Sequence, residues 1–314
     1  APRGRRECPR AARALRGVRW LALSPDGRNL YASSPANDAI AAFARNPRTG
    51  GLTQLPGGDA CIEDRLARRG SGCPTGVGLN YPRTIAISPD GLNAYVASDT
   101  ADSVIPGDPA DGDAVSAFAR DPRTGALRQL PGKAACIKDT IARSVTACET
   151  IGRGLLDAFN VSVSPDGKHV YVASDASRLG AIAIFRREAT GELTQLPGTS
   201  GCLGNGRGCG RAEGIAGTDS VTLSPNGRRL YATGFFGWSL GVFSRDPATG
   251  AIRQLRGAKA CVRDVNSKAR CGQTIKGLQG PRDVVLSPDG HTAYVPSSVA
   301  GTINVFAVGA RPRR

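Results

Sequence analysis

Several residue types and sequence features are scarce in this chain. Its 314 residues include no methionine, two histidines and only 5% aromatic residues. No apolar run approaches the roughly 18 residues that a membrane-spanning helix needs, so we expect no membrane span. A helical bundle is disfavoured too, because 41 glycines and 21 prolines suit many short strands and turns. The chain does not open with methionine, and we expect a processed form whose signal peptide has been removed.

Acidic residues are the minority charge. The chain has 26 Asp and Glu against 41 Lys and Arg, which gives a net charge of +15. Residues 1–19 hold seven Arg and one Glu, and the C-terminus adds Arg311, Arg313 and Arg314. A basic terminus can bind nucleic acid or an anionic surface such as a cell-wall polymer. No RNA-binding fingerprint or helix-turn-helix pattern accompanies it, so we expect no nucleic-acid partner and favour a compositional bias toward Arg.

An internal repeat is the strongest signal in the sequence. Ser-Pro-Asp-Gly starts at Ser24, Ser88, Ser164 and Ser287, and Ser-Pro-Asn-Gly starts at Ser224, with spacings of 64, 76, 60 and 63 residues. A tyrosine follows each of these glycines by four residues, at Tyr31, Tyr95, Tyr171, Tyr231 and Tyr294. A later apolar stretch of each unit ends in a phenylalanine, at Phe43, Phe118, Phe185, Phe243 and Phe306. Repetition at this period is typical of solenoids and propellers.

Each unit predicts four antiparallel strands joined by tight turns. In the second unit the expected strands are 84–87, 94–97, 114–118 and 126–130. Pro fixes φ in the Ser-Pro-Asp-Gly turn and Gly tolerates a positive φ. The sequence therefore predicts an all-β fold, a β-propeller with five four-stranded repeats. We expect the tyrosine and phenylalanine columns to pack between blades.

The repeat boundaries give the expected domain organisation. An Arg-rich segment, 1–17, precedes a single propeller domain over 18–309, and a basic tail covers 310–314. The predicted blades are 18–56, 82–131, 158–197, 218–256 and 281–309, with the cysteine loops between them. The fifth unit lacks a fourth strand. We therefore expect a three-stranded last blade in a ring truncated at the N-terminus, its missing strand lying upstream of Ala1.

The repeat text resembles a known family. Tyr95-Val96-Ala97-Ser98 and Tyr171-Val172-Ala173-Ser174 follow Ser-Pro-Asp-Gly in a pattern similar to the YVTN-repeat, lactonase-like (6-phosphogluconolactonase-like) β-propellers. The resemblance covers roughly Val18 to Phe306. It implies the propeller fold, commonly with seven blades, and an activity that opens a sugar lactone with His, Glu and Arg around the pocket. No His of this chain matches that pattern, so no catalytic residue is carried over.

Eight of the nine cysteines form local pairs between successive units. The predicted disulfides are Cys61–Cys73, Cys136–Cys148, Cys202–Cys209 and Cys261–Cys271. Zinc binding is disfavoured, because the short Cys-x-x-Cys spacing and accompanying His are missing. Disulfides imply an oxidising compartment, so we expect a secreted, periplasmic or cell-surface protein. Cys8 occupies the second position of a pair whose first member is missing; an intermolecular disulfide or a reactive thiol is the alternative.

The longer, variable loops share one face of the predicted propeller, where function is expected. The residues just before the first strand of each unit converge there on the central channel, and Arg19, Arg83, Asp219 and Arg282 form a candidate site for an anionic ligand. Solvated or locally paired arginines are the alternative.

Two loops of this face carry further candidate sites. Phe235, Phe236 and Trp238 could stack on a sugar ring or a partner, or pack against the neighbouring cysteine loop. Asp108, Asp111 and Asp113 offer oxygen ligands suited to Ca²⁺, the one cofactor considered, with a solvated acidic loop as the alternative.

The combined features favour a binding protein over an enzyme. The two histidines, His169 and His291, follow Ser-Pro-Asp-Gly turns and belong to the opposite face, so the variable face has no evident general base. We therefore expect an extracytoplasmic binding module for a cell-surface glycan, peptide or protein. The alternative is a lactonase-like hydrolase that opens a sugar lactone.

Overall fold

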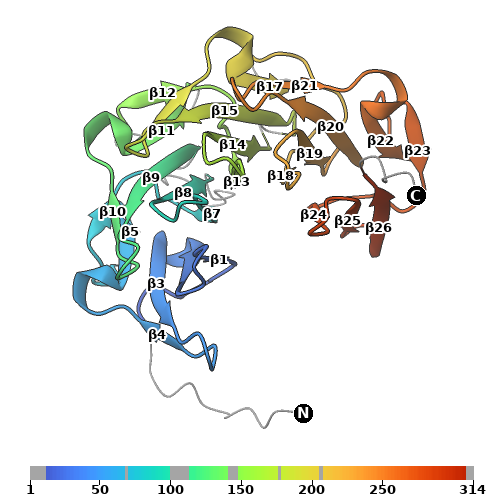
Figure 1. The fold of residues 1–314 in the computed structure, drawn as a ribbon. Helices are drawn as coiled ribbons and strands as arrows, with labels where there is room; N and C mark the ends of the chain where they lie inside the picture. The colour runs from blue at the N-terminus through green and yellow to red at the C-terminus, as the bar shows by residue number, and fades with distance from the viewer. Residues whose placement is uncertain are drawn as a thin grey trace.

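The computed structural model describes residues 12–67, 70–99, 113–140, 148–175, 178–204 and 208–308. Within these ranges the regular elements are β-strands and short 3-10 turns, and the strands form five sheets. Figure 1 shows the sheets following one another around an arc, with the first strand of each sheet toward its centre. The predicted all-β propeller class is therefore confirmed. No helix of the described residues is long and apolar enough to cross a membrane.

The five sheets are numbered here as blades 1 to 5. Blade 1 contains β1 (Trp20–Leu23), β2 (Asn29–Ser34), η1 (Pro35–Asn37), β3 (Ala39–Arg45), β4 (Leu52–Gln54), η2 (Gly57–Asp59), β5 (Cys61–Asp64) and β6 (Thr75–Gly76). Blade 2 contains β7 (Pro82–Ile87), β8 (Asn93–Ser98), β9 (Ala114–Arg120), β10 (Leu127–Gln129), η3 (Gly132–Ala134), β11 (Cys136–Asp139) and β12 (Thr150–Gly152). Blade 3 contains β13 (Ala158–Val163), β14 (His169–Ser174), β15 (Ala181–Arg187), β16 (Leu193–Gln195), η4 (Gly198–Gly201) and β17 (Cys202–Gly204).

Blades 4 and 5 complete the series. Blade 4 contains β18 (Val221–Leu223), β19 (Arg229–Gly234), β20 (Ser239–Arg245), β21 (Ile252–Gln254), η5 (Gly257–Lys259), β22 (Cys261–Asp264) and β23 (Gln273–Ile275). Blade 5 contains β24 (Val285–Leu286), β25 (Thr292–Ser297) and β26 (Thr302–Ala307), the three strands expected of the last unit. Among the described residues, no further strand pairs with the outer edge of β26.

The fourth strand of each complete blade is interrupted. In blade 1, β4 pairs with the second half of β3 and β5 pairs with its first half, so both lie along one edge of β3. The break falls at Pro56 and at Gly57, whose φ is +57°. Proline has no N–H for a strand ladder, and a positive φ ends the extended path. The segments between the cysteines therefore extend the sheets rather than only linking them.

The four predicted disulfides are confirmed. Their Cα–Cα distances are 5.4 Å for Cys61–Cys73, 5.2 Å for Cys136–Cys148, 4.8 Å for Cys202–Cys209 and 5.0 Å for Cys261–Cys271. Each first cysteine begins a strand that pairs with the third strand of its blade. The bridges thus fix the loops that follow the broken fourth strands. Cys8 lies outside the described residues.

Consecutive blades are joined by a repeated polar contact, which we call the interblade clamp. The Tyr171 hydroxyl of blade 3 donates to the Gly250 carbonyl (2.7 Å) and accepts from Arg245 Nε (2.7 Å), both of blade 4. The same guanidinium reaches Asp166 and His169 of blade 3. Equivalent clamps use Tyr31 with Arg120 and Tyr95 with Arg187. The clamps thus link blades 1 to 4 in series.

Candidate functional site

A cavity of about 950 Å³ opens where the inner hairpins of all five blades end. Backbone hydrogen bonds extend three of these hairpins to the cavity: the N–H of Arg19 bonds to Ser33 O, that of Asp99 to Tyr81 O, and that of Arg282 to Pro296 O. We call this space the channel cavity. It is lined by side chains that precede a first strand, begin one or follow a second strand; Arg83, predicted to precede its strand, lies within β7. The lining residues are Arg19, Trp20, Arg83, Thr84, Asp99, Asp157, Phe159, Asn160, Asp175, Arg178, Asp219, Ser220, Phe235, Phe236, Arg282 and Asp283.

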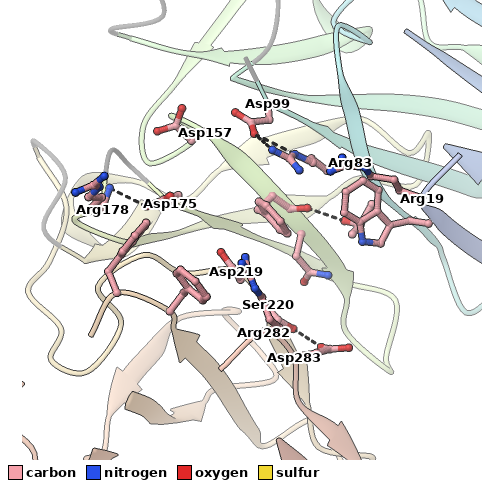
Figure 2. A pocket seen from close by; sticks show the side chains of 16 residues that line it. Arg19, Arg83, Asp99, Asp157, Asp175, Arg178, Asp219, Ser220, Arg282 and Asp283 are labelled. Atoms are coloured by element: carbon pink, nitrogen blue, oxygen red, sulfur yellow. Dashed lines mark hydrogen bonds and ion pairs between the residues drawn. The ribbon is translucent and has the colours of Figure 1, made fainter. Parts of the chain in front are cut away.

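The four residues predicted at the channel mouth all line this cavity. Arg83 is buried and pairs with Asp99, its Nε lying 3.0 Å from Oδ2. Arg282 pairs with Asp219 across blades 4 and 5 at 2.8 Å. The locally paired alternative therefore applies to these two arginines. Arg19 is exposed and forms no ion pair within the part of the chain that is described. Figure 2 shows both ion pairs directed toward the same space. Ligand binding by the four residues stays a prediction.

Aromatic rings hold the cavity's guanidinium groups in place. The Arg83 guanidinium carbon lies 4.4 Å from the ring centre of Phe159 and 5.6 Å from that of Trp20. The Arg282 guanidinium carbon lies 3.8 Å from the ring centre of Phe235. A guanidinium stacked on a ring keeps its N–H groups in its own plane, where they can still donate hydrogen bonds. The cavity thus combines apolar ring surfaces with oriented donors.

Asp219 has the protonation behaviour of a candidate acid–base group. The residue is only 4% exposed, and burial raises the pKa of its carboxyl to about 6, although Arg282 opposes that shift. A carboxyl that titrates near neutral pH can take a proton from water and give it back. Asp219 combines this property with a position on the wall of an open cavity.

A cluster of three carboxylates lies beside Arg83. One oxygen from each of Asp99, Asp113 and Asp157 lies within 4.8 Å of the others. Asp113 is buried and accepts a hydrogen bond from the Asp157 backbone N–H (2.6 Å). Oxygen ligands of this kind suit a hard cation. Of the predicted calcium ligands, Asp113 belongs to this cluster, whereas Asp108 and Asp111 lie outside the described residues.

The predicted aromatic patch divides between two cavities. Phe235 and Phe236 line the channel cavity and contact each other edge to face, with ring centres 5.0 Å apart. Phe236 and Trp238 line a second cavity of about 440 Å³, whose opposite wall includes Asn266 and Lys268 of a cysteine loop. Phe236 and Trp238 thus lie beside the cysteine loop, and ligand binding by the aromatic residues stays a prediction.

Several lining residues were not singled out from the sequence. Trp20, Asp157 and Asp175 line the channel cavity, but none of them was among the predicted site residues. A signal did exist, because Asp99 and Asp175 each follow a Val-Ala-Ser at the end of a second strand. The histidines lie away from this cavity: His169 belongs to an interblade clamp, and neither histidine is among the lining residues.

Solved structures with a similar fold include proteins named as lactonases. No family model and no curated protein sequence matches the chain. The periplasmic gluconolactonase PpgL of Pseudomonas aeruginosa aligns with a TM-score of 0.54 at 16% identity, over 94% of this chain and 74% of that protein. A candidate 6-phosphogluconolactonase from Bacteroides fragilis aligns with a TM-score of 0.52 at 18% identity, over 94% and 72%.

A protein from Lactobacillus plantarum aligns with a TM-score of 0.50 at 19% identity. That alignment covers 76% of this chain but only 54% of the Lactobacillus protein. At such identities the likeness shows a shared propeller fold. The four disulfides are consistent with an extracytoplasmic protein.

Proposed function

We propose that the protein is a lactonase-like hydrolase that opens a polyhydroxylated lactone in the channel cavity. The observation that carries the proposal is the buried Asp219 carboxyl on the cavity wall, 2.8 Å from the half-exposed Arg282 guanidinium. The pair places a proton acceptor next to a cationic hydrogen-bond donor, the two groups that ester hydrolysis needs.

The reaction assigns one task to each partner. Water attacks the lactone carbonyl carbon while the Asp219 carboxylate takes the proton that the water loses. The carbonyl oxygen becomes an oxyanion, which the Arg282 N–H groups stabilise. The ring C–O bond then breaks, the carbonyl reforms, and Asp219 returns its proton to the departing ring oxygen. The product is an open-chain hydroxy acid, formed from one water and one lactone with no other reactant.

The walls of the cavity suit a sugar-derived ring. Trp20, Phe159 and Phe235 supply apolar ring faces, and the Asn160 amide and the Arg19 guanidinium supply hydrogen-bonding groups. Small-molecule sites combine apolar walls with a few such polar groups in cavities of roughly 300–1,000 Å³. A cavity of about 950 Å³ accommodates a single sugar acid lactone with space beside it.

This proposal takes the alternative from the sequence analysis rather than its preferred binding module. The binding module was favoured because the variable face has no histidine to act as a base. A carboxyl with its pKa raised to about 6 removes that objection, because a general base need not be histidine. The fold neighbours are known by names that include gluconolactonase, so aldonolactones are the substrates to test first.

The test measures acid release from a panel of γ- and δ-aldonolactones at constant pH. The wild-type protein should hydrolyse at least one lactone faster than buffer. Asp219→Asn should lower that rate by roughly 10²- to 10⁴-fold, the range for loss of a general base. Asp59→Asn is the matched control, because it removes a carboxylate that pairs with Arg128 outside the cavity.

Two results would contradict the hydrolase. One is a wild-type rate equal to the buffer rate for every lactone; the other is an Asp219→Asn variant as active as Asp59→Asn. Saturable binding of an aldonic acid without hydrolysis of any lactone would instead support the binding module favoured by the sequence analysis.

A further inference from the structure

The second cavity, bounded by Phe236 and Trp238, adjoins the channel cavity. Phe236 lines both spaces and is 43% exposed. The Arg178 guanidinium carbon lies 4.9 Å from the Phe236 ring centre on the channel side. A ligand held in the channel cavity could therefore extend past this ring into the second cavity.

Trp238 departs from the repeat in a backbone conformation that disfavours it. The residue immediately before the third strand has a positive φ in every blade: 50° for Asp38, 57° for Asp113, 74° for Gly180, 47° for Trp238 and 66° for Gly301. Asp and Gly tolerate this region, whereas a bulky residue there is a genuine outlier. Strain of this kind persists where the surroundings enforce it, and it gathers at ligand sites.

The aspartates at this position have a structural role that Trp238 does not reproduce. Asp38 Oδ1 accepts a hydrogen bond from the Tyr81 backbone N–H (2.8 Å) of the next blade, and Asp113 does the same for Asp157. In blade 5, Gly280 occupies the repeat position of Tyr81 and Asp157. The Gly280 N–H is therefore the donor that corresponds to position 238 of blade 4. The Trp238 side chain instead forms a wall of the second cavity and makes no hydrogen bond with the described residues.

The aromatic loop and the cysteine loop that faces it are held together. Asp264 N–H donates to Trp238 O (2.8 Å), and the Ser267 hydroxyl donates to Gly237 O (2.5 Å). The Cys261–Cys271 disulfide closes the cysteine loop from its base. The second cavity therefore has two walls already in position before any ligand binds, which lowers the entropy lost on binding.

The polar groups of this cavity carry both signs of charge. Glu213 and Lys268 line it together with the Asn266 amide, and all three side chains are exposed. Such a set offers donors and acceptors without favouring an anion or a cation. Ring faces beside mixed donors and acceptors suit a neutral pyranose, whose C–H face stacks and whose hydroxyls both donate and accept.

We infer that the second cavity is a subsite for a neutral hexopyranosyl unit joined to the group in the channel cavity. The inference rests on the proposed function for the identity of that group, an aldonolactone or its aldonic acid. The preferred substrate is then a glycosylated lactone of disaccharide size rather than a free monosaccharide lactone.

The two tryptophans allow each cavity to be followed separately. Trp20 lines the channel cavity and Trp238 the second cavity, and the chain has no other tryptophan. The probes are gluconate and its 4-O-galactosyl derivative, both stable acids that need no turnover. In a Trp20→Phe protein, the emission of Trp238 should change with the galactosyl compound and not with gluconate.

Calorimetry gives the corresponding affinities for the protein with its native Trp20. The galactosyl derivative should bind roughly two- to tenfold more tightly than gluconate, the range expected for one stacked ring. Trp238→Asp should abolish this difference. The Trp238→Asp variant restores the aspartate found at this repeat position in blades 1 and 2, and that aspartate can accept a hydrogen bond from the Gly280 N–H. Its melting temperature should therefore be no lower than that of the wild type. An unchanged melting temperature would show that the variant has lost binding and not folding.

The outcomes separate the subsite from the hydrolase. The subsite would be overturned if wild type bound gluconate and its galactosyl derivative equally well, or bound neither. It would also be overturned if the Trp238→Asp protein still bound the galactosyl derivative more tightly than gluconate. If the subsite results hold but no lactone is hydrolysed, the hydrolase fails and the cavity remains a glycan-binding site.

Discussion

The interblade clamp predicts that one arginine stabilises the fold far more than its counterpart in blade 1. Arg245 ends β20, and its side chain is 0% exposed. It donates to Tyr171 Oη, Gly227 O and the Asp166 carboxylate, and it contacts His169 Nδ1 at 2.7 Å. Arg45 ends β3 at the equivalent position, but the one hydrogen bond that its side chain makes to the described residues goes to Gly27 O at 3.2 Å within its own blade.

The expected magnitudes follow from these contacts. Arg245→Ala leaves the His169 ring nitrogen buried without its partner and removes the cation beside Asp166. Breaking a buried charged contact costs about 3–5 kcal/mol, and the lower half of that range applies because the Asp166 side chain is 29% exposed. Arg45→Ala should cost less than about 1 kcal/mol, the net value of a single hydrogen bond. Both variants remove the same charge from the same strand position.

Urea unfolding with the disulfides intact measures both free energies. Arg245→Ala should lower the transition midpoint with little change in slope, and Arg45→Ala should leave it nearly unchanged. A Tyr171→Phe, Arg245→Ala double-mutant cycle should show a coupling energy above about 0.5 kcal/mol. Equal losses in the Arg45 and Arg245 variants would refute the reasoning, because the loss would then come from the strand position and not from the clamp.

Two further predictions concern titration and metal binding. Burial and the neighbouring Arg245 guanidinium lower the pKa of His169, so the unfolded chain binds the proton more readily than the folded chain does. The contribution of His169 to the free energy of unfolding should be fully present above the ordinary histidine pKa of about 6.5, and it should fall as the pH drops below that value. His169→Asn, which installs the residue of blades 1 and 2 (Asn29, Asn93), should flatten the pH dependence of the melting temperature between pH 7 and pH 5; an unchanged slope would exclude His169 as its source. Calcium should stabilise the folded protein by about 1.4 kcal/mol at ten times its Kd if the carboxylates of Asp99, Asp113 and Asp157 bind it. Asp113→Asn should remove that stabilisation, and no shift of the melting temperature at millimolar calcium would eliminate the sequence-based calcium site.

Local sequence signals were enough to predict the blade pattern and the disulfides. Ser-Pro-Asp-Gly dictates its own turn: Ser88 Oγ bonds to Asp90 and accepts from Asn93 N–H, contacts made within five residues. Cysteines 7 to 12 residues apart across one turn have few other partners within reach. The cavity-lining position of Arg19, Arg83, Asp219 and Arg282 was predictable as well, because a place near the start of a first strand follows from the repeat register, whereas ligand binding by these residues stays a prediction.

Contacts between blades depended on the tertiary structure. Arg282 of blade 5 pairs with Asp219 of blade 4 because the rotation between sheets decides which side chains meet, and no local pattern encodes that rotation. The same packing buries Asp219 and so sets its pKa. The strained Trp238 likewise lies in a loop held by a neighbour distant in sequence. The sequence by itself determined the repeat, its turns and its cross-links, which are short-range. Tertiary packing decided the Asp219–Arg282 ion pair, the raised pKa of Asp219 and the shape of both cavities, because these properties exist only once blades lie side by side.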